Sequence, residues 1–144
     1  MTFQVRRRAT ALALSTAAVA FTCSSLATPA DAAGRHFGNV ATYLNATVQG
    51  CKVSVDGGAK WRVFARLDNT DNRRRDKRSG AVIMVRNGNT TNRRIDTGYI
   101  AGGKVSEVKS ILVPKGAQYS LAVGVGAGQM GDGGPVELSA LRRC

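Results

Sequence analysis

Histidine and acidic side chains are scarce in this chain of 144 residues, and their scarcity argues against catalysis. The single histidine, His36, stands near the start of the predicted domain, where chains are often poorly ordered. A serine or cysteine nucleophile needs a base beside it, and no second histidine is present to supply one. Most Asp and Glu residues stand in expected turns or next to cations, where turn formation and charge balance are their usual roles. We therefore expect no catalytic residues and no enzyme, with a site assembled from carboxylates distant in sequence as the alternative.

Cysteine is scarce as well, with three in the chain, and few other residues suit a metal. Two cysteines and one histidine are a thin ligand set for zinc. Asp68, Asp71 and Asp76 lie beside five cations that repel a divalent ion, and their spacing is not that of an EF-hand. Residues 126–131 match the letters of a dinucleotide-binding loop, but the Gly-Gly-Pro of 133–135 prevents the helix that must follow. The sequence therefore predicts neither a metal site nor a cofactor.

The N-terminal segment has the three parts of a signal peptide. Arg6, Arg7 and Arg8 are followed by an Ala- and Leu-rich stretch over residues 9–26, and Ala-Asp-Ala at 30–32 offers small residues for cleavage. We expect residues 1–32 to be removed and the protein to be secreted by the general secretory route of a bacterium. An uncleaved membrane anchor and a twin-arginine signal are the alternatives, and after processing no transmembrane span is expected.

Removal of the signal peptide takes Cys23 with it and leaves Cys51 and Cys144 as a pair in an oxidising compartment. An even cysteine count in an exported protein predicts a disulfide. The bridge would close a loop of more than ninety residues, which the chain-entropy model values at about 4 to 5 kcal/mol. A pair of free or metal-bound thiols is the alternative.

From about residue 37 the apolar residues alternate with polar ones, and the segments are bounded by Gly, Asn and Asp, which is typical of β-strands. A hairpin is predicted over residues 51–67, with Cys51 and Trp61 on one inner face and a turn at Asp56. The apolar run 81–85 predicts a central strand. Further strands are expected at 94–100, at 104–113 with a bulge, at 119–125, and from Val136 to Cys144 after a mobile glycine loop at 126–134.

The predicted fold is one all-β domain over 37–144, preceded by a flexible segment at 33–36. Six to eight short strands without helical periodicity favour a small antiparallel sandwich over a closed barrel. The disulfide with a buried tryptophan resembles the immunoglobulin and fibronectin-like sandwiches. The spacing departs from theirs, because Trp61 follows the first cysteine by only ten residues and the second cysteine ends the chain. This resemblance concerns architecture and implies no activity.

The charge is strongly unbalanced, with 21 Lys and Arg against 9 Asp and Glu and a net charge of +12. Such an excess attracts acidic partners over a distance. The densest cluster is Arg73, Arg74, Arg75, Lys77 and Arg78, which we expect on a polar loop between two strands. Guanidinium groups bind phosphate and carboxylate in a two-pronged way, so these five residues form the predicted anion-binding site.

These features predict a secreted, monomeric, non-enzymatic module that binds an anionic cell-wall polymer or an acidic protein. No aromatic residue interleaves with the basic run, so sequence-specific nucleic-acid binding is not expected. A protease inhibitor or toxin-like effector that presents the basic loop is the alternative, and a basic surface that only keeps the protein soluble is a third reading.

Overall fold

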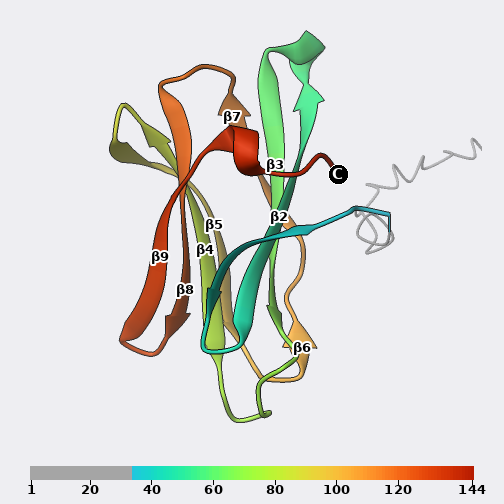
Figure 1. The fold of residues 1–144 in the computed structure, drawn as a ribbon, viewed down its shortest axis with the longest axis vertical. Coiled ribbons are helices and arrows are strands. Elements are labelled where there is room, and N and C mark those ends of the chain that lie inside the picture. The colour runs from blue at the N-terminus through green and yellow to red at the C-terminus, as the bar shows by residue number, and fades with distance from the viewer. Residues whose placement is uncertain (1–33) are drawn as a thin grey trace, which may run out of the picture.

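The computed structural model describes residues 34–144, which form two antiparallel sheets packed face to face (Figure 1). The predicted signal peptide of residues 1–32 lies outside these described residues. The first sheet contains β1 (Gly38–Tyr43), β2 (Ala46–Val55), β3 (Lys60–Asn69), β6 (Lys104–Val105) and β7 (Lys109–Pro114). The second contains, in spatial order, β5 (Asn89–Ile100), β4 (Arg78–Arg86), β8 (Tyr119–Ala127) and β9 (Met130–Val136). The all-β sandwich-like prediction is confirmed.

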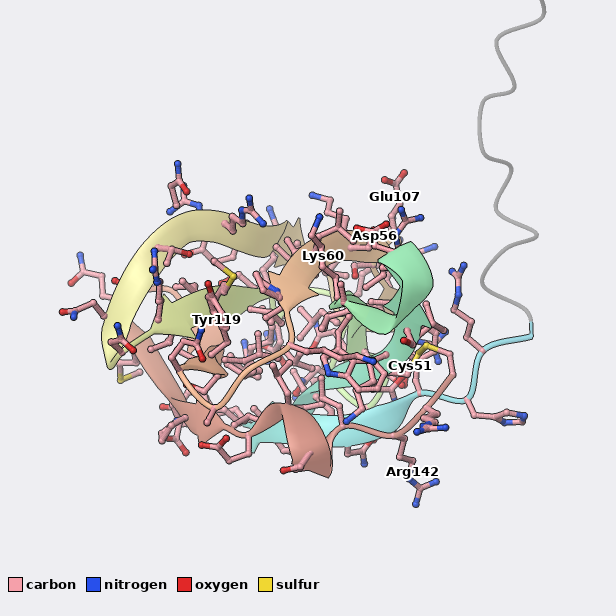
Figure 2. All side chains as sticks on the ribbon, turned by 90° about the horizontal axis from the view of Figure 1, so that it is seen from above. Cys51, Asp56, Lys60, Glu107, Tyr119 and Arg142 are labelled. Carbon is pink, nitrogen blue, oxygen red and sulfur yellow. A yellow bond between two sulfur atoms is a disulfide. The ribbon has the colours of Figure 1, made fainter. Side chains whose placement is uncertain are left out.

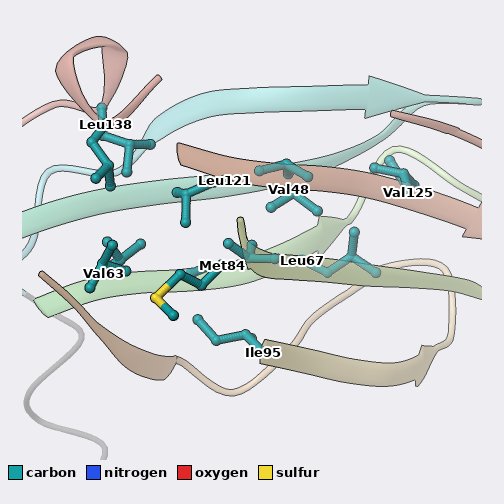
Figure 3. Packing of buried hydrophobic residues seen from close by; sticks show 14 residues of the cluster. Val48, Val63, Leu67, Met84, Ile95, Leu121, Val125 and Leu138 are labelled. Carbon is teal, nitrogen blue, oxygen red and sulfur yellow. The ribbon is translucent and has the colours of Figure 1, made fainter. Parts of the chain in front are cut away.

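Apolar side chains from the inner faces of both sheets form one core between them (Figure 3). The first sheet contributes Val48, Val63, Leu67 and Val113, and the second contributes Val82, Met84, Ile95, Leu121, Val123 and Val125. These are the alternate positions of each strand, since successive side chains of a strand point to opposite faces. Strand β4 alternates buried and half-buried residues along its length, so the apolar run at 81–85 is a central strand, as predicted.

The disulfide between Cys51 and Cys144 is present, with the two Cα atoms 5.1 Å apart (Figure 2). The C-terminal tail reaches β2 after the short 3-10 helix η3 (Leu138–Ala140). Gly38 is the first residue of β1 and pairs with Gly50. Beyond that point the tail continues along the same edge of β2, with Lys52 and Arg143 in a parallel bridge. The disulfide therefore connects the tail to β2, an interior strand of the first sheet.

The inner face of β2 is the opposite of the predicted one. Cys51 pairs with Phe64 on the outer face, whereas Lys52 pairs with Val63 on the core side. The prediction that Cys51 shares an inner face with Trp61 is therefore wrong, and Lys52 is the residue that faces the core side, with 6% of its surface exposed. The outer face is also covered beside Cys51, because Arg35 of the N-terminal segment lies over the ring of its partner Phe64 at 3.8 Å. Alternation alone could not distinguish the two faces.

The glycine-rich segment is a strand rather than a mobile loop. Residues Met130–Val136 form β9 and pair with β8 along its whole length. A Cβ atom on Gly133 would lie 2.4 Å from the carbonyl oxygen of Val123, so the close approach of the two strands requires glycine there. The chain leaves the sheet after Val136 and forms η3, which corrects the predicted last strand from Val136 to Cys144.

Two further details differ from the prediction. The segment 104–113 is divided into the short β6 and the longer β7, because residues 106–108 leave the ladder while Ser106 bonds back to Leu67. Nine strands are present among the described residues, rather than six to eight. In a constant-type immunoglobulin sandwich the second and third strands lie in opposite sheets. Here β2 and β3 form a hairpin within one sheet around the tight turn of η2 (Asp56–Gly58), so the strand order differs.

The part of the chain that the structure describes contains no helix that is both long and apolar enough to cross a membrane.

Candidate anion-binding site

The predicted anion-binding residues lie together at one end of the sandwich, in the connection from β3 to β4 (Figure 1). Arg73, Arg74, Arg75 and Lys77 are in the loop and are exposed. Arg78 differs, because it is the first residue of β4, is half-buried, and its Nη1 donates a hydrogen bond to the carbonyl oxygen of Lys77. We call this end of the molecule the basic end, defined by Arg73, Arg74, Arg75, Lys77, Arg78 and Lys104.

The loop that carries the cations is tied down by a buried asparagine. Asn69, the last residue of β3, is fully buried. Its side-chain amide donates hydrogen bonds of 2.9 Å to the carbonyl oxygens of Asp76 and Ile100, and its side-chain oxygen accepts one of 2.7 Å from Asn72. Asn72 in turn donates to the carbonyl oxygen of Leu44. The loop is thus connected to its own strand, to β5 and to the β1–β2 turn.

The cations are presented by a tight turn that rests on a glycine. The amide of Asp76 donates a 2.8 Å hydrogen bond to the carbonyl oxygen of Arg73, so Arg74 and Arg75 occupy the middle of the turn. Gly102 packs directly beneath it, and a Cβ atom there would lie 2.0 Å from the carbonyl oxygen of Arg73. A turn held in this way loses less conformational entropy on binding than a free loop would.

The charges of the basic end are not neutralised by any carboxylate of the described residues. Among residues 34–144, none of the five predicted anion-binding residues forms an ion pair with a carboxylate. Asp68 uses one carboxylate oxygen to accept hydrogen bonds from the backbone amide and the hydroxyl of Thr70. The guanidinium and ammonium groups of the turn are therefore available to an external anion, with attraction that salt screens over about 8 to 10 Å.

Four large apolar side chains that the sequence analysis did not select are exposed at the same end. They are Leu44 with 48% of its surface exposed, Tyr99 with 59%, Val105 with 41% and Met130 with 65%. They come from the β1–β2 turn, the end of β5, β6 and the start of β9. The hydroxyl of Tyr99 donates to the carbonyl oxygen of Gly128, which connects β5 to the β8–β9 turn. These four residues place apolar surface at the same end of the sandwich as the cations.

A sequence signal for one of these residues exists. Leu44 and Asn45 form the two-residue turn between β1 and β2, and both have positive φ angles, 46° and 60°. Turns of this kind favour Asn, Asp and Gly. A leucine there gains nothing for the turn itself, and its side chain is half exposed.

The other basic pairs do not join this site. Arg93 and Arg94 lie on the edge strand β5, where Arg93 donates to the carbonyl oxygen of Leu112. Arg142 and Arg143 lie in the C-terminal tail, which runs beside β2 and away from the basic end (Figure 1). The predicted residues 73–78 are therefore brought together with Lys104 and the four apolar residues, but not with the remaining arginine pairs. Comparison with known protein families, with curated proteins and with solved structures gives no match to this chain.

Proposed function

We propose that this protein is a secreted, non-enzymatic module that binds an anionic polymer or an acidic partner protein through the basic end. The observation that carries the proposal is the turn of Arg73, Arg74 and Arg75, which is held by Asn69 and Gly102 and whose charges have no carboxylate partner within the described residues. Because Asn69 and Gly102 fix the position of the turn, its cations are held in place for an anionic ligand.

The exposed apolar residues of the basic end extend the proposal. Electrostatic attraction brings an anionic partner to the surface and raises the association rate. Apolar contacts such as those available to Tyr99 and Met130 then add short-range affinity that salt does not screen. We therefore expect binding to weaken with salt without disappearing.

The experiment compares retention on an immobilised polyanion such as heparin for two variants of equal net charge. The first replaces Arg73, Arg74, Arg75 and Lys77 with Gln. The control replaces four exposed arginines away from the basic end, Arg62, Arg86, Arg94 and Arg142, with Gln. Arg78 is left unchanged because it is half-buried in β4.

The proposal expects the first variant to elute at clearly lower salt than the control variant, although both carry the same charge. Equal elution of the two variants would show that only net charge matters and would reject the basic end as the binding site. A further variant with Leu44, Tyr99 and Met130 replaced by Ser tests the apolar contribution, and it should elute earlier than the unmodified protein in high salt.

A further inference from the structure

A second group of cations lies at the opposite end of the sandwich, around the single tryptophan of the chain. They line a cavity of about 420 Å³, which we call the cation cleft and define by Lys52, Ser54, Trp61, Lys115, Arg143 and Cys144. This volume lies within the roughly 300 to 1,000 Å³ of sites that hold small molecules. The cleft shares no residue with the basic end and stands apart from the function proposed above.

Strand register explains why these side chains converge. Lys52 and Ser54 are alternate residues of β2 on the face that points into the sandwich, and Ser54 pairs with Trp61 of β3. Arg143 lies opposite Lys52 in the parallel bridge, so both side chains lie on the same face. Lys115 enters from the β7–β8 connection, where its ammonium donates a 2.9 Å hydrogen bond to the hydroxyl of Ser54.

Two cationic groups of the cleft lie against the Trp61 ring, and the charges of Arg143 and Lys115 both act on Lys52. The ammonium nitrogens of Lys115 and Lys52 lie 4.0 Å and 4.8 Å from the centroid of the Trp61 ring. Within the described chain, no carboxylate forms an ion pair with Lys52, Lys115 or Arg143, the C-terminal one on Cys144 included. Like charges held this close repel each other, and the indole ring offsets only part of that repulsion.

Lys52 is the buried cation of the three, so its charge costs the most folding free energy. Its side chain is 6% exposed, and its ammonium, which has three donors, makes one hydrogen bond, to the carbonyl oxygen of Leu138. Burial lowers the pKa of Lys52, and the charges of Arg143 and Lys115 lower it further. A buried cation beside two others costs folding free energy. Its presence therefore indicates a role that an apolar residue could not fill.

We infer that the cation cleft binds the phosphate group of a small soluble phosphate monoester, between Lys52, Lys115 and Arg143 and beside Trp61. A phosphate dianion matches three converging cations better than a single carboxylate does, since it offers two charges and three acceptor oxygens. The remaining volume of the cleft then holds the organic part of the ligand. The arginine supplies a two-pronged contact and the lysines supply compact charges.

Trp61 provides the readout, because no other tryptophan contributes to the fluorescence. The purified protein is titrated with inorganic phosphate and with glycerol phosphate, and acetate at equal ionic strength serves as the control. We expect a saturable change in Trp61 emission with both phosphates and a rise in melting temperature. Acetate should give neither. The titration extends to a phosphate concentration of roughly 10 mM, so that even a weak site with a Kd of about 1 mM would approach saturation.

Two adjacent arginines provide a matched pair of variants. Arg143→Gln removes a cation of the cleft, whereas Arg142→Gln removes its neighbour, which points outward from the tail on the opposite face (Figure 2). Lys115→Gln removes a second cation of the cleft. We expect Arg143→Gln and Lys115→Gln to weaken phosphate binding by about tenfold or more, the effect of one charge-assisted hydrogen bond. Arg142→Gln and the fourfold Gln variant of the basic end should bind phosphate normally.

Three results would overturn the inference. The first is no saturable response to either phosphate in a protein that melts cooperatively. The second is an equal loss of binding in Arg142→Gln and Arg143→Gln, which would indicate a general charge effect. The third is a response to phosphatidic acid vesicles with none to soluble phosphates, which would assign the cleft to a membrane surface. Melting of each unliganded variant near the temperature of the parent protein shows that a loss of binding is not a loss of folding.

Discussion

Lys52 of β2 and Arg143 of the C-terminal tail lie opposite each other in one parallel β-bridge. Neighbouring side chains of the tail point to opposite sides of this bridge. The amide of Lys52 donates to the carbonyl oxygen of Arg142 at 2.9 Å, and the amide of Cys144 donates to the carbonyl oxygen of Lys52 at 3.1 Å. On one face of this bridge Cys144 is bonded to Cys51. On the other face Arg143 lies with Lys52 in the cation cleft. The disulfide therefore holds the cleft together, and changes at either site should affect the other.

Removing the disulfide should destabilise the fold strongly. The bridge joins residues 93 positions apart, and the chain-entropy model gives about 4 to 5 kcal/mol for a loop of this length. We expect the double variant Cys51→Ser, Cys144→Ser to lose about this much unfolding free energy in urea titrations. The variant should also lose the phosphate response of Trp61, because the tail carries Arg143. A double variant that unfolds at the same urea concentration as the parent would contradict both expectations.

Asn69→Ala should loosen the basic end. The substitution removes the donor that serves the carbonyl oxygens of Asp76 and Ile100, and it leaves these half-buried acceptors without that bond. Each such loss costs about 1 to 3 kcal/mol, so we expect about 2 to 6 kcal/mol in total. Amide hydrogen exchange should quicken across residues 70–77. Asn92→Ala, on the exposed face of β5, is the control and should change the stability by less than about 0.5 kcal/mol.

Gly102→Ala tests the contact beneath the basic turn. The added methyl group would lie 2.0 Å from the carbonyl oxygen of Arg73, so the turn must move. We expect a loss of about 1 to 3 kcal/mol in unfolding free energy and earlier elution from a polyanion column. At Gly134 a Cβ atom meets nothing within 4 Å, so Gly134→Ala should leave both measurements unchanged. Normal column retention of Gly102→Ala would show that the position of the turn is unimportant for binding.

The stability of the protein should depend on pH through Lys52. Its folded-state pKa is lowered from the usual 10.5 by burial and by Arg143 and Lys115. In the window between the lowered pKa and 10.5, the unfolded chain binds more protons at Lys52 than the folded chain does. Stability therefore rises with pH across that window, and the charged lysine weakens the fold below it. We expect the stability of Lys52→Met relative to the parent protein to fall as the pH rises from 7 toward 10. Parallel pH profiles from urea titrations would contradict this.

Local sequence patterns were sufficient for the strands that alternate cleanly and for the turn between β2 and β3. The central position of β4 followed from its apolar run, and the pairing of Cys51 with Cys144 followed from the count of cysteines left after the predicted signal peptide. The positions of the cations at 73–77 in a loop were also predicted correctly. Each of these features depends on residues that are neighbours in sequence or on a simple count.

The face of β2 that enters the core could not be predicted in this way. Cys51 and Lys52 are both buried: Cys51 is bonded to Cys144 and pairs with Phe64, over which Arg35 lies, and Lys52 donates to Leu138 of η3. The segments that cover them come from the two ends of the described chain. The strand β9 was missed for a related reason, because glycines have no alternating side chains and pair through backbone bonds alone.

The sequence by itself determined that the chain forms short antiparallel strands, carries a large positive charge and can close one long loop with a disulfide. Only the tertiary structure decided where that charge gathers: four cations on a braced turn beside Leu44, Tyr99, Val105 and Met130, and three around Trp61 at the far end. The physical reason is that composition and alternation depend on single residues and their neighbours. The two cation groups depend instead on strand register and on the path of the tail, which bring together residues as distant as Lys52 and Arg143.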